Sequence, residues 1–167
     1  AHFLEHMSFK GTKTKSAKQI ANILDLIGAQ VNAHTSKEYT CYYLTILSEN
    51  VNKGLQILFD LVLNSRLAIN DIKTEKQVVL EEINMYEDTP DENIHDVFAT
   101  TIWHGHRLGL PILGTQKSIE NINKENLTRY KEDYLNPQRL LISIAGRIRN
   151  QQEIIQKVTN LVKDIKK

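Results

Sequence analysis

The sequence predicts an α+β fold, with helices packed on one face of an antiparallel sheet. Three observations support this prediction. Apolar residues recur at helical spacing along several segments. Residues 39–47 are rich in β-forming side chains and follow a short strand-like segment at 29–35, which is typical of a hairpin. The apolar run 139–146 is expected to be a further strand in the same thin sheet.

The helix boundaries follow from capping residues and helix breakers. Ser16 is expected to cap a helix that stops at Gly28, because a serine hydroxyl accepts a backbone hydrogen bond and glycine tolerates the left-handed conformation. Ser48 is expected to begin the next helix, and Asn70 to cap a long one that Pro90 follows. The expected helices are 2–9, 16–27, 48–63, 70–88, 91–103, 123–135 and 151–166.

Apolar stripes on these helices are expected to face the core. Cys41 is predicted to be a small core residue and, as the only cysteine, it excludes an intrachain disulfide. The stripes comprise Ile20, Ile23, Leu24 and Ile27; Val51, Leu55, Leu58, Phe59, Val62 and Leu63; Ile72, Val79, Ile83 and Tyr86; and Ile154, Ile155, Val158, Leu161, Val162 and Ile165.

The composition argues against several classes of protein. The chain has 167 residues, is 41% hydrophobic and 25% charged, and has a net charge of +1, values that are ordinary for a globular protein. No apolar run approaches the ~20 residues of a membrane span, so no membrane interaction is expected. Lysine and arginine are scattered along the chain rather than clustered, so nucleic acid is not an expected partner.

The first helix carries the pattern His2-Phe3-Leu4-Glu5-His6. Residues four apart share a helix face, so the imidazoles of His2 and His6 point the same way, with Glu5 beside them. Two such imidazoles can bind one zinc ion, and the glutamate can then accept a proton from water. The order is the reverse of the better-known zinc helix and is a signature of zinc peptidases. The simpler interpretation is a chance cluster on a solvated helix.

A catalytic zinc needs a third protein ligand, and the long helix offers candidates. Glu75 and Glu82 fall within its apolar stripe, where burying a carboxylate is costly unless a cation compensates it. Glu81 points away from the stripe and is a weaker candidate. The alternative is that these glutamates lie at the edge of the stripe and reach water.

Five stretches occur together in an order that resembles the pitrilysin/insulinase family of zinc peptidases, most closely its shorter bacterial and mitochondrial-processing-peptidase type. The resemblance spans nearly the whole chain and implies that family's α+β catalytic half. The stretches are HFLEHMSFKGT, VNAHTSKEYTCYY, EKQVVLEEI, HRLGLPILGTQKSI and YLNPQRLLISIAG.

The resemblance implies a role for each residue of the motif. His2, His6 and Glu82 would bind one Zn²⁺, and Glu5 would be the general base. Glu75 matches a second family glutamate that supports catalysis, either behind a histidine or near the water.

The resemblance also implies a substrate strand, in which Asn32, Ala33 and His34 would pair with an extended peptide. The family usually has an aromatic residue where His34 stands, and the alternative for His34 is an ordinary surface residue. The remaining histidines have no ligand spacing to the motif and are expected on loops or the surface: His95, His104 and His106.

The expected unit is a single incomplete catalytic domain over residues 1–167. Family members have strands before the zinc helix and a second, similar half, so leading strands and a partner half are expected to lie elsewhere. The second half of the same protein or a partner subunit would complete the substrate chamber. An open sheet edge also favours association into a homodimer. The bacterial cytoplasm or the mitochondrial matrix is the favoured compartment.

The predicted function is a zinc-dependent metalloendopeptidase that hydrolyses extended polypeptide or peptide substrates through a metal-activated water. The first alternative is a non-catalytic relative that acts as a scaffold or as a presequence-binding subunit. The second is a metal-binding module without peptidase activity. The presence of His2, Glu5, His6 and Glu82 together favours the enzyme.

Overall fold

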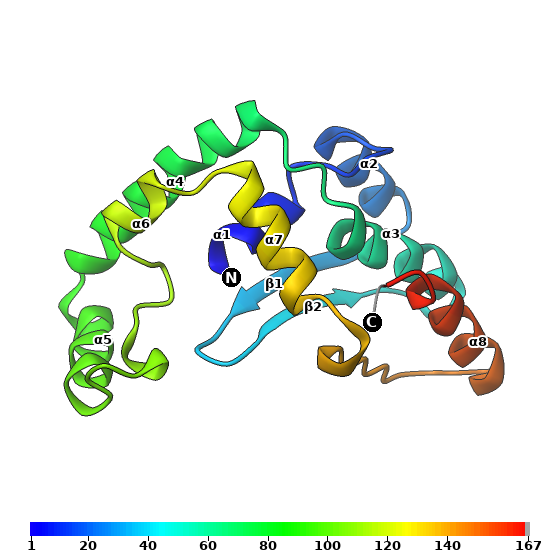
Figure 1. Ribbon diagram of the computed structural model, residues 1–167. Helices are drawn as coiled ribbons and strands as arrows, with labels where there is room; N and C mark the ends of the chain where they lie inside the picture. The colour runs from blue at the N-terminus through cyan, green and yellow to red at the C-terminus, as the bar shows by residue number, and fades with distance from the viewer. Residues whose placement is uncertain (166–167) are drawn as a thin grey trace.

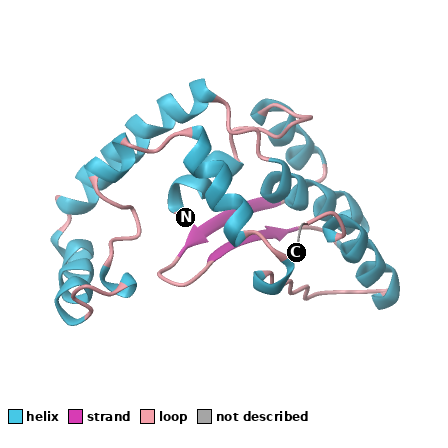
Figure 2. Cartoon of the chain, viewed as in Figure 1, coloured by secondary structure: helices cyan, strands magenta, loops and turns pink. Residues whose placement is uncertain are grey.

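The computed structural model describes residues 1–165, which form helices around a two-stranded antiparallel sheet (Figures 1 and 2). This arrangement confirms the α+β class. The helices are α1 (His2–Ser8), α2 (Ala17–Leu26), α3 (Val51–Asn64), α4 (Ile69–Glu87), α5 (Pro90–Ile102), α6 (Gln116–Glu120), α7 (Lys124–Tyr134) and α8 (Gln151–Val162); the strands are β1 (Gln30–Thr35) and β2 (Thr40–Thr45). Short 3₁₀ turns occupy Ser48–Asn50, Arg107–Gly109 and Pro137–Arg139.

The helix ends agree with the sequence at α2 and differ at α4. Ser16 caps α2 in a capping box with Gln19, and Gly28 follows the helix with φ +62°. The cap of α4 is Ala68, and Asn70 is the second residue of the helix, so the predicted capping role of Asn70 is wrong. The short helix α6 was not expected from the sequence. The last helix ends at Val162, and residue 166 of its predicted range lies outside the described residues.

The sheet is smaller than predicted. β1 and β2 pair in an antiparallel hairpin, with His34 opposite Cys41, and Cys41 is half-buried rather than a core residue. The run 139–146 does not form a strand. Leu140 has extended dihedral angles, but no described strand lies beside it to form ladder hydrogen bonds, and Leu141 is 93% exposed.

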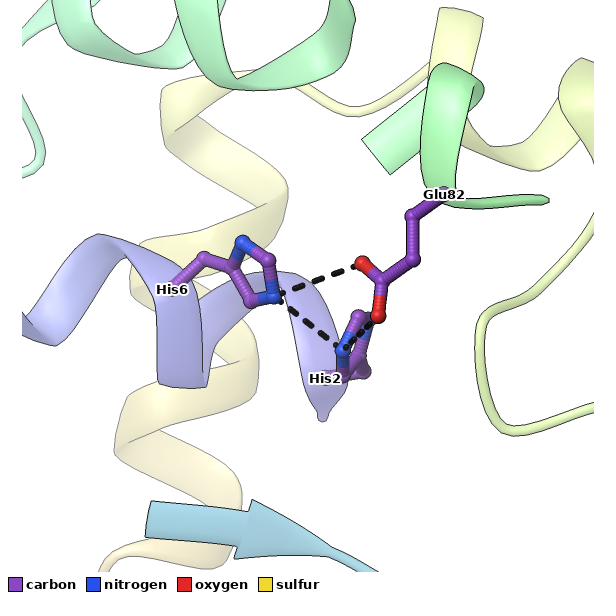
Figure 3. A group of neighbouring side chains, drawn as sticks. All are labelled: His2, His6 and Glu82. Carbon is purple, nitrogen blue, oxygen red and sulfur yellow. Dashed lines mark hydrogen bonds and ion pairs between the residues drawn. The ribbon is translucent and has the colours of Figure 1, made fainter. Parts of the chain in front are cut away.

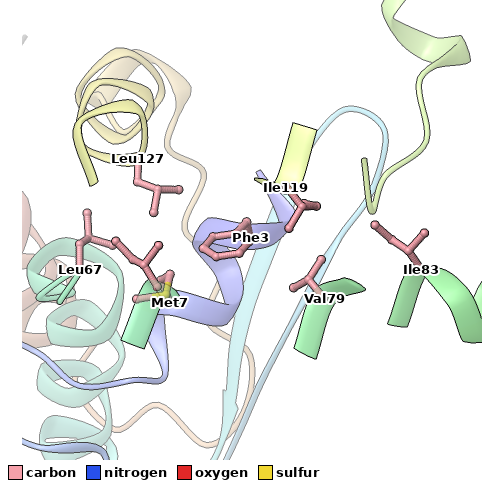
Figure 4. Packing of buried hydrophobic residues seen from close by; sticks show 8 residues of the cluster. Phe3, Met7, Leu67, Val79, Ile83, Ile119 and Leu127 are labelled. Atoms are coloured by element: carbon pink, nitrogen blue, oxygen red, sulfur yellow. The ribbon is translucent and has the colours of Figure 1, made fainter. Parts of the chain in front are cut away.

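One of two apolar clusters joins α1 to α4 (Figure 4). Phe3 and Met7 lie four apart on α1 and are 3% and 0% exposed, and they pack with Val79 and Ile83 of α4. Burying such side chains stabilises the fold by about 1.5–3 kcal/mol each. This packing holds α1 against α4, and α1 also contacts strand β1 of the hairpin. The cluster is completed by Leu67, Ile72, Ile119 and Leu127.

The second apolar cluster lies between α2, α3 and the hairpin. Leu24 of α2 and Leu61 of α3 are buried there, and Val31 of β1 and Leu44 of β2 pack against it from the sheet. This cluster fixes the hairpin relative to the rest of the chain. Within residues 1–165, none of the helices combines the length and apolar character that crossing a membrane would require.

Candidate metal centre

Helix α1 presents two imidazoles toward one point. His2 and His6 are one helical turn apart, and their Nε2 atoms lie 3.1 Å from each other. The rings meet edge to face, with centroids 4.5 Å apart. Phe3 and Met7, on a neighbouring face of α1, pack against α4 and so hold the helix with both imidazoles near α4.

Helix α4 brings a carboxylate to the same point (Figure 3). The two oxygens of Glu82 each lie 3.6 Å from one imidazole, Oε1 from Nε2 of His2 and Oε2 from Nε2 of His6. One potential ligand atom from each of the three residues therefore lies within 4.8 Å of the other two. Glu81, the weaker candidate, is exposed and stands outside this cluster.

The spacing of these donor atoms suits a shared zinc ion. Zinc bonds of ~2.0–2.2 Å at tetrahedral angles place neighbouring ligand atoms ~3.3–3.6 Å apart. The two Nε2 atoms lie 3.1 Å apart, and each lies 3.6 Å from a different oxygen of Glu82. Two imidazole nitrogens and one carboxylate are also a donor set that suits a catalytic zinc, with a fourth position left for water.

Burial shapes the charge of these donors. Desolvation, and then repulsion by His6, lowers the pKa of His2 to about 4, so His2 is neutral at pH 7, as a metal-binding imidazole must be. Desolvation also raises the pKa of Glu82, with further contributions from Glu5 and Glu75 that His6 partly opposes. A carboxylate in such surroundings favours a cation beside it.

Glu75 lies behind His6. It is 2% exposed, and the Nδ1 atom of His6 is 2.8 Å from its Oε1, so a protonated Nδ1 donates a hydrogen bond to this carboxylate. Of the two positions that the resemblance left open for Glu75, the structure has the one behind a histidine. Oε2 of Glu75 lies 2.5 Å from Nζ of Lys10, a residue to which the sequence pattern assigns no role.

Glu5 is also buried, at 9% exposure, and its carboxylate accepts a hydrogen bond from Oγ1 of Thr35. Thr35 is the last residue of β1, so the hairpin touches α1 at this point. The hydroxyl of Thr35 is also 3.3 Å from that of Thr40 on β2. Thr35 was not singled out from the sequence, because only the packing of the hairpin on α1 brings it to Glu5.

Strand β1 carries the predicted substrate residues. Asn32 and His34 are exposed and Ala33 is half-buried. Among the described residues, β1 has a strand on one side only, and the backbone N–H of Ala33 donates to Oδ1 of Asn32 at 2.8 Å. The ring of His34 lies near two tyrosine rings, Tyr39 and Tyr43, at 5.7 and 6.1 Å between centroids.

The other histidines stand apart from His2, His6 and Glu82, as the sequence predicts. His95, His104 and His106 are all exposed. His106 uses its Nδ1 to accept the backbone N–H of Leu108 in a local turn. These three histidines therefore carry no part of the candidate site.

Comparison with protein families gives a match over residues 1–116 to the family described as insulinase (peptidase family M16). The chain is 51% identical over 148 residues to YmxG of Bacillus subtilis, named an uncharacterized zinc protease. It is 44% identical over 161 residues to an uncharacterized zinc protease of Rickettsia bellii. These alignments cover 89% and 96% of this chain but only 36% and 39% of the relatives, so the chain spans well under half of their length.

Solved structures share the fold. A protease from Helicobacter pylori matches with a TM-score of 0.91 over 99% of this chain and 40% of its own, at 24% identity. Pitrilysin matches with a TM-score of 0.69 over 81% of this chain and 15% of its own, at 26% identity. At these identities the likeness concerns the arrangement of the helices and the hairpin.

Proposed function

Because this chain belongs to the insulinase family of peptidases, M16, we propose that it carries the metal site of a zinc-dependent endopeptidase that cuts extended polypeptides or peptides. The single observation that carries this proposal is the convergence of His2, His6 and Glu82 from two helices to within 4.8 Å. The relatives' names as zinc proteases support the choice of metal.

In this proposal, His2, His6 and Glu82 hold one Zn²⁺. Zinc would supply Lewis acidity, which lowers the pKa of water to about 7 and polarises a carbonyl oxygen. The chain contributes by fixing the donors before the metal arrives. Phe3 and Met7 anchor α1, and the neutral state of His2 leaves one ring nitrogen unprotonated and able to bind a metal.

Glu5 is the proposed general base. The hydrogen bond from Thr35 engages Oε2 of Glu5 and fixes the carboxylate, so Oε1 is the oxygen left to take a proton from the attacking water. The same carboxyl group can then return that proton to the leaving amine nitrogen. Burial of Glu5 strengthens these proton transfers, because bulk water competes less for the carboxylate.

Strand β1 is the proposed binding edge for the substrate backbone. A peptide that adds alongside Asn32, Ala33 and His34 would form main-chain hydrogen bonds, which tolerate many side chains. The N–H of Ala33 now donates to the side chain of Asn32, so a peptide carbonyl would replace this intrachain bond. Thr35 links the same strand to Glu5, which sets the substrate edge beside the base.

We further propose that the second half of the same protein, or a partner subunit, completes the substrate chamber. The chain spans only 36–40% of its matched relatives and of the H. pylori structure, which supports a larger assembly. A homodimer is the alternative. Exposed apolar side chains offer contact area for either partner, among them Ile94, Phe98, Ile102, Trp103 and Leu141.

The test is cleavage of a quenched peptide by the full-length protein. We expect cleavage that a chelator abolishes and added zinc restores, and we expect Glu5→Gln to cleave at least about a hundredfold more slowly while still binding zinc. Glu81→Gln is the matched control, because Glu81 is exposed and outside the cluster. Cleavage that survives Glu5→Gln would refute the proposed base. Zinc binding without cleavage by the wild type would favour a scaffold or metal module.

A further inference from the structure

Lys10 follows helix α1 and has none of the roles assigned above. Its Nζ lies 2.5 Å from Oε2 of Glu75, while the other oxygen of Glu75 faces Nδ1 of His6 at 2.8 Å. Lys10, Glu75 and His6 therefore form a chain of contacts that leads from the surface to the metal cluster.

The contact between Lys10 and Glu75 depends on charge. Oε2 of Glu75 has no hydrogen bond of good geometry, although the ammonium group is close to it. The two side chains also differ in burial: that of Glu75 is 3% exposed and that of Lys10 is 38% exposed. A buried carboxylate beside a half-exposed lysine depends on that lysine far more than the lysine depends on the carboxylate.

His6 cannot take over this compensation when it ligates a cation. The ion-pair partners of Glu75 within the described residues are His6 and Lys10. An imidazole that binds a metal is neutral, so in the metal-bound protein Lys10 is the positive side chain that remains beside Glu75. A carboxylate that Lys10 holds in place can accept the Nδ1–H of His6, which fixes the ring and leaves Nε2 free for the metal.

We propose that Lys10 is a positioning residue for the metal site: it holds the Glu75 carboxylate as the acceptor that orients His6. This inference rests on the proposed zinc site. The competing explanation is an ion pair that affects only the stability of the fold. The two explanations differ in whether Lys10 acts on zinc affinity and whether it does so through Glu75.

The experiment measures zinc affinity of the full-length protein by competition with a chromophoric chelator. Lys10→Met is expected to bind zinc about 10- to 100-fold more weakly, the usual effect of losing an outer contact of a metal ligand. Lys10→Arg keeps the charge and is expected to bind zinc nearly as tightly as the wild type. Lys18→Met is the matched control, since Lys18 is exposed and has no ion pair among the described contacts.

A double-mutant cycle tests the route of action. If Lys10 acts through Glu75, then adding Lys10→Met to Glu75→Gln should weaken zinc binding no further. Thermal unfolding of the metal-free variants shows whether Lys10→Met is folded, and Lys10→Arg provides a second readout. The inference would be overturned if Lys10→Met bound zinc as tightly as the wild type. It would also be overturned if Lys10→Met weakened zinc binding equally in the wild-type and Glu75→Gln backgrounds. A wild type that binds no zinc would instead refute the proposed function.

Discussion

Replacing Glu75 by glutamine separates the role of its charge from the role of its shape. The amide oxygen of glutamine can still accept the Nδ1–H of His6, where the carboxylate now lies 2.8 Å from Nδ1. The substitution therefore converts a charge-assisted hydrogen bond into a neutral one of about half the strength. We expect zinc affinity to fall about 10- to 100-fold, which corresponds to about 1.4–2.7 kcal/mol.

Stability of the metal-free protein should respond differently to Glu75→Gln. The carboxylate is almost fully buried, so neutralising it removes a desolvation cost, while the freed Lys10 is exposed enough to be hydrated. We expect the free energy of unfolding to change by less than about 1 kcal/mol. Chelator competition gives the zinc affinity and thermal unfolding of the metal-free protein gives the stability, with Glu81→Gln as control. Unchanged zinc affinity, or a large loss of stability that accounts for a weaker affinity, would refute this reasoning.

Three further predictions concern the scaffold. Val79→Ala should lower the free energy of unfolding by about 2 kcal/mol, because Val79 is 0% exposed between α1 and α4. Val78 is 45% exposed, so Val78→Ala should change the free energy of unfolding little, and chemical denaturation checks both variants. Ser16→Ala should cost about 1 kcal/mol by removing the capping box of α2, and an unchanged denaturation midpoint would contradict this. Burial, and then Lys13, lowers the pKa of Lys131 from 10.5 to about 8, so between these values the unfolded chain binds more protons and the free energy of unfolding rises with pH. Lys131→Met should remove this rise, which denaturation across that pH range would detect.

Much of the site could be predicted from the sequence because its residues follow helical periodicity. The spacing of His2 and His6 places both imidazoles on one face of a helix whatever surrounds it. The position of Glu82 within an apolar stripe marks it as a carboxylate that faces the interior side of α4. These features depend on local geometry, and the sequence displays local geometry directly.

The remaining features depend on contacts between distant segments. Lys10 and Glu75 are 65 positions apart in the sequence, and Thr35 reaches Glu5 only because the hairpin packs on α1. The predicted strand at 139–146 is extended and apolar, yet a strand also needs a neighbour with free backbone groups, which its own sequence does not specify. Asn70 has the side chain of a helix cap, but the chain turns into α4 two residues earlier, at Ala68.

The most direct test of the proposed metal centre is the zinc content of the purified full-length protein, measured by elemental analysis after dialysis. We expect one zinc per chain in the wild type and in Glu5→Gln, and almost none in His6→Ala or Glu82→Ala, with His95→Ala as a control that retains the metal. One zinc per chain in His6→Ala would contradict the proposal that α1 and α4 supply the zinc ligands.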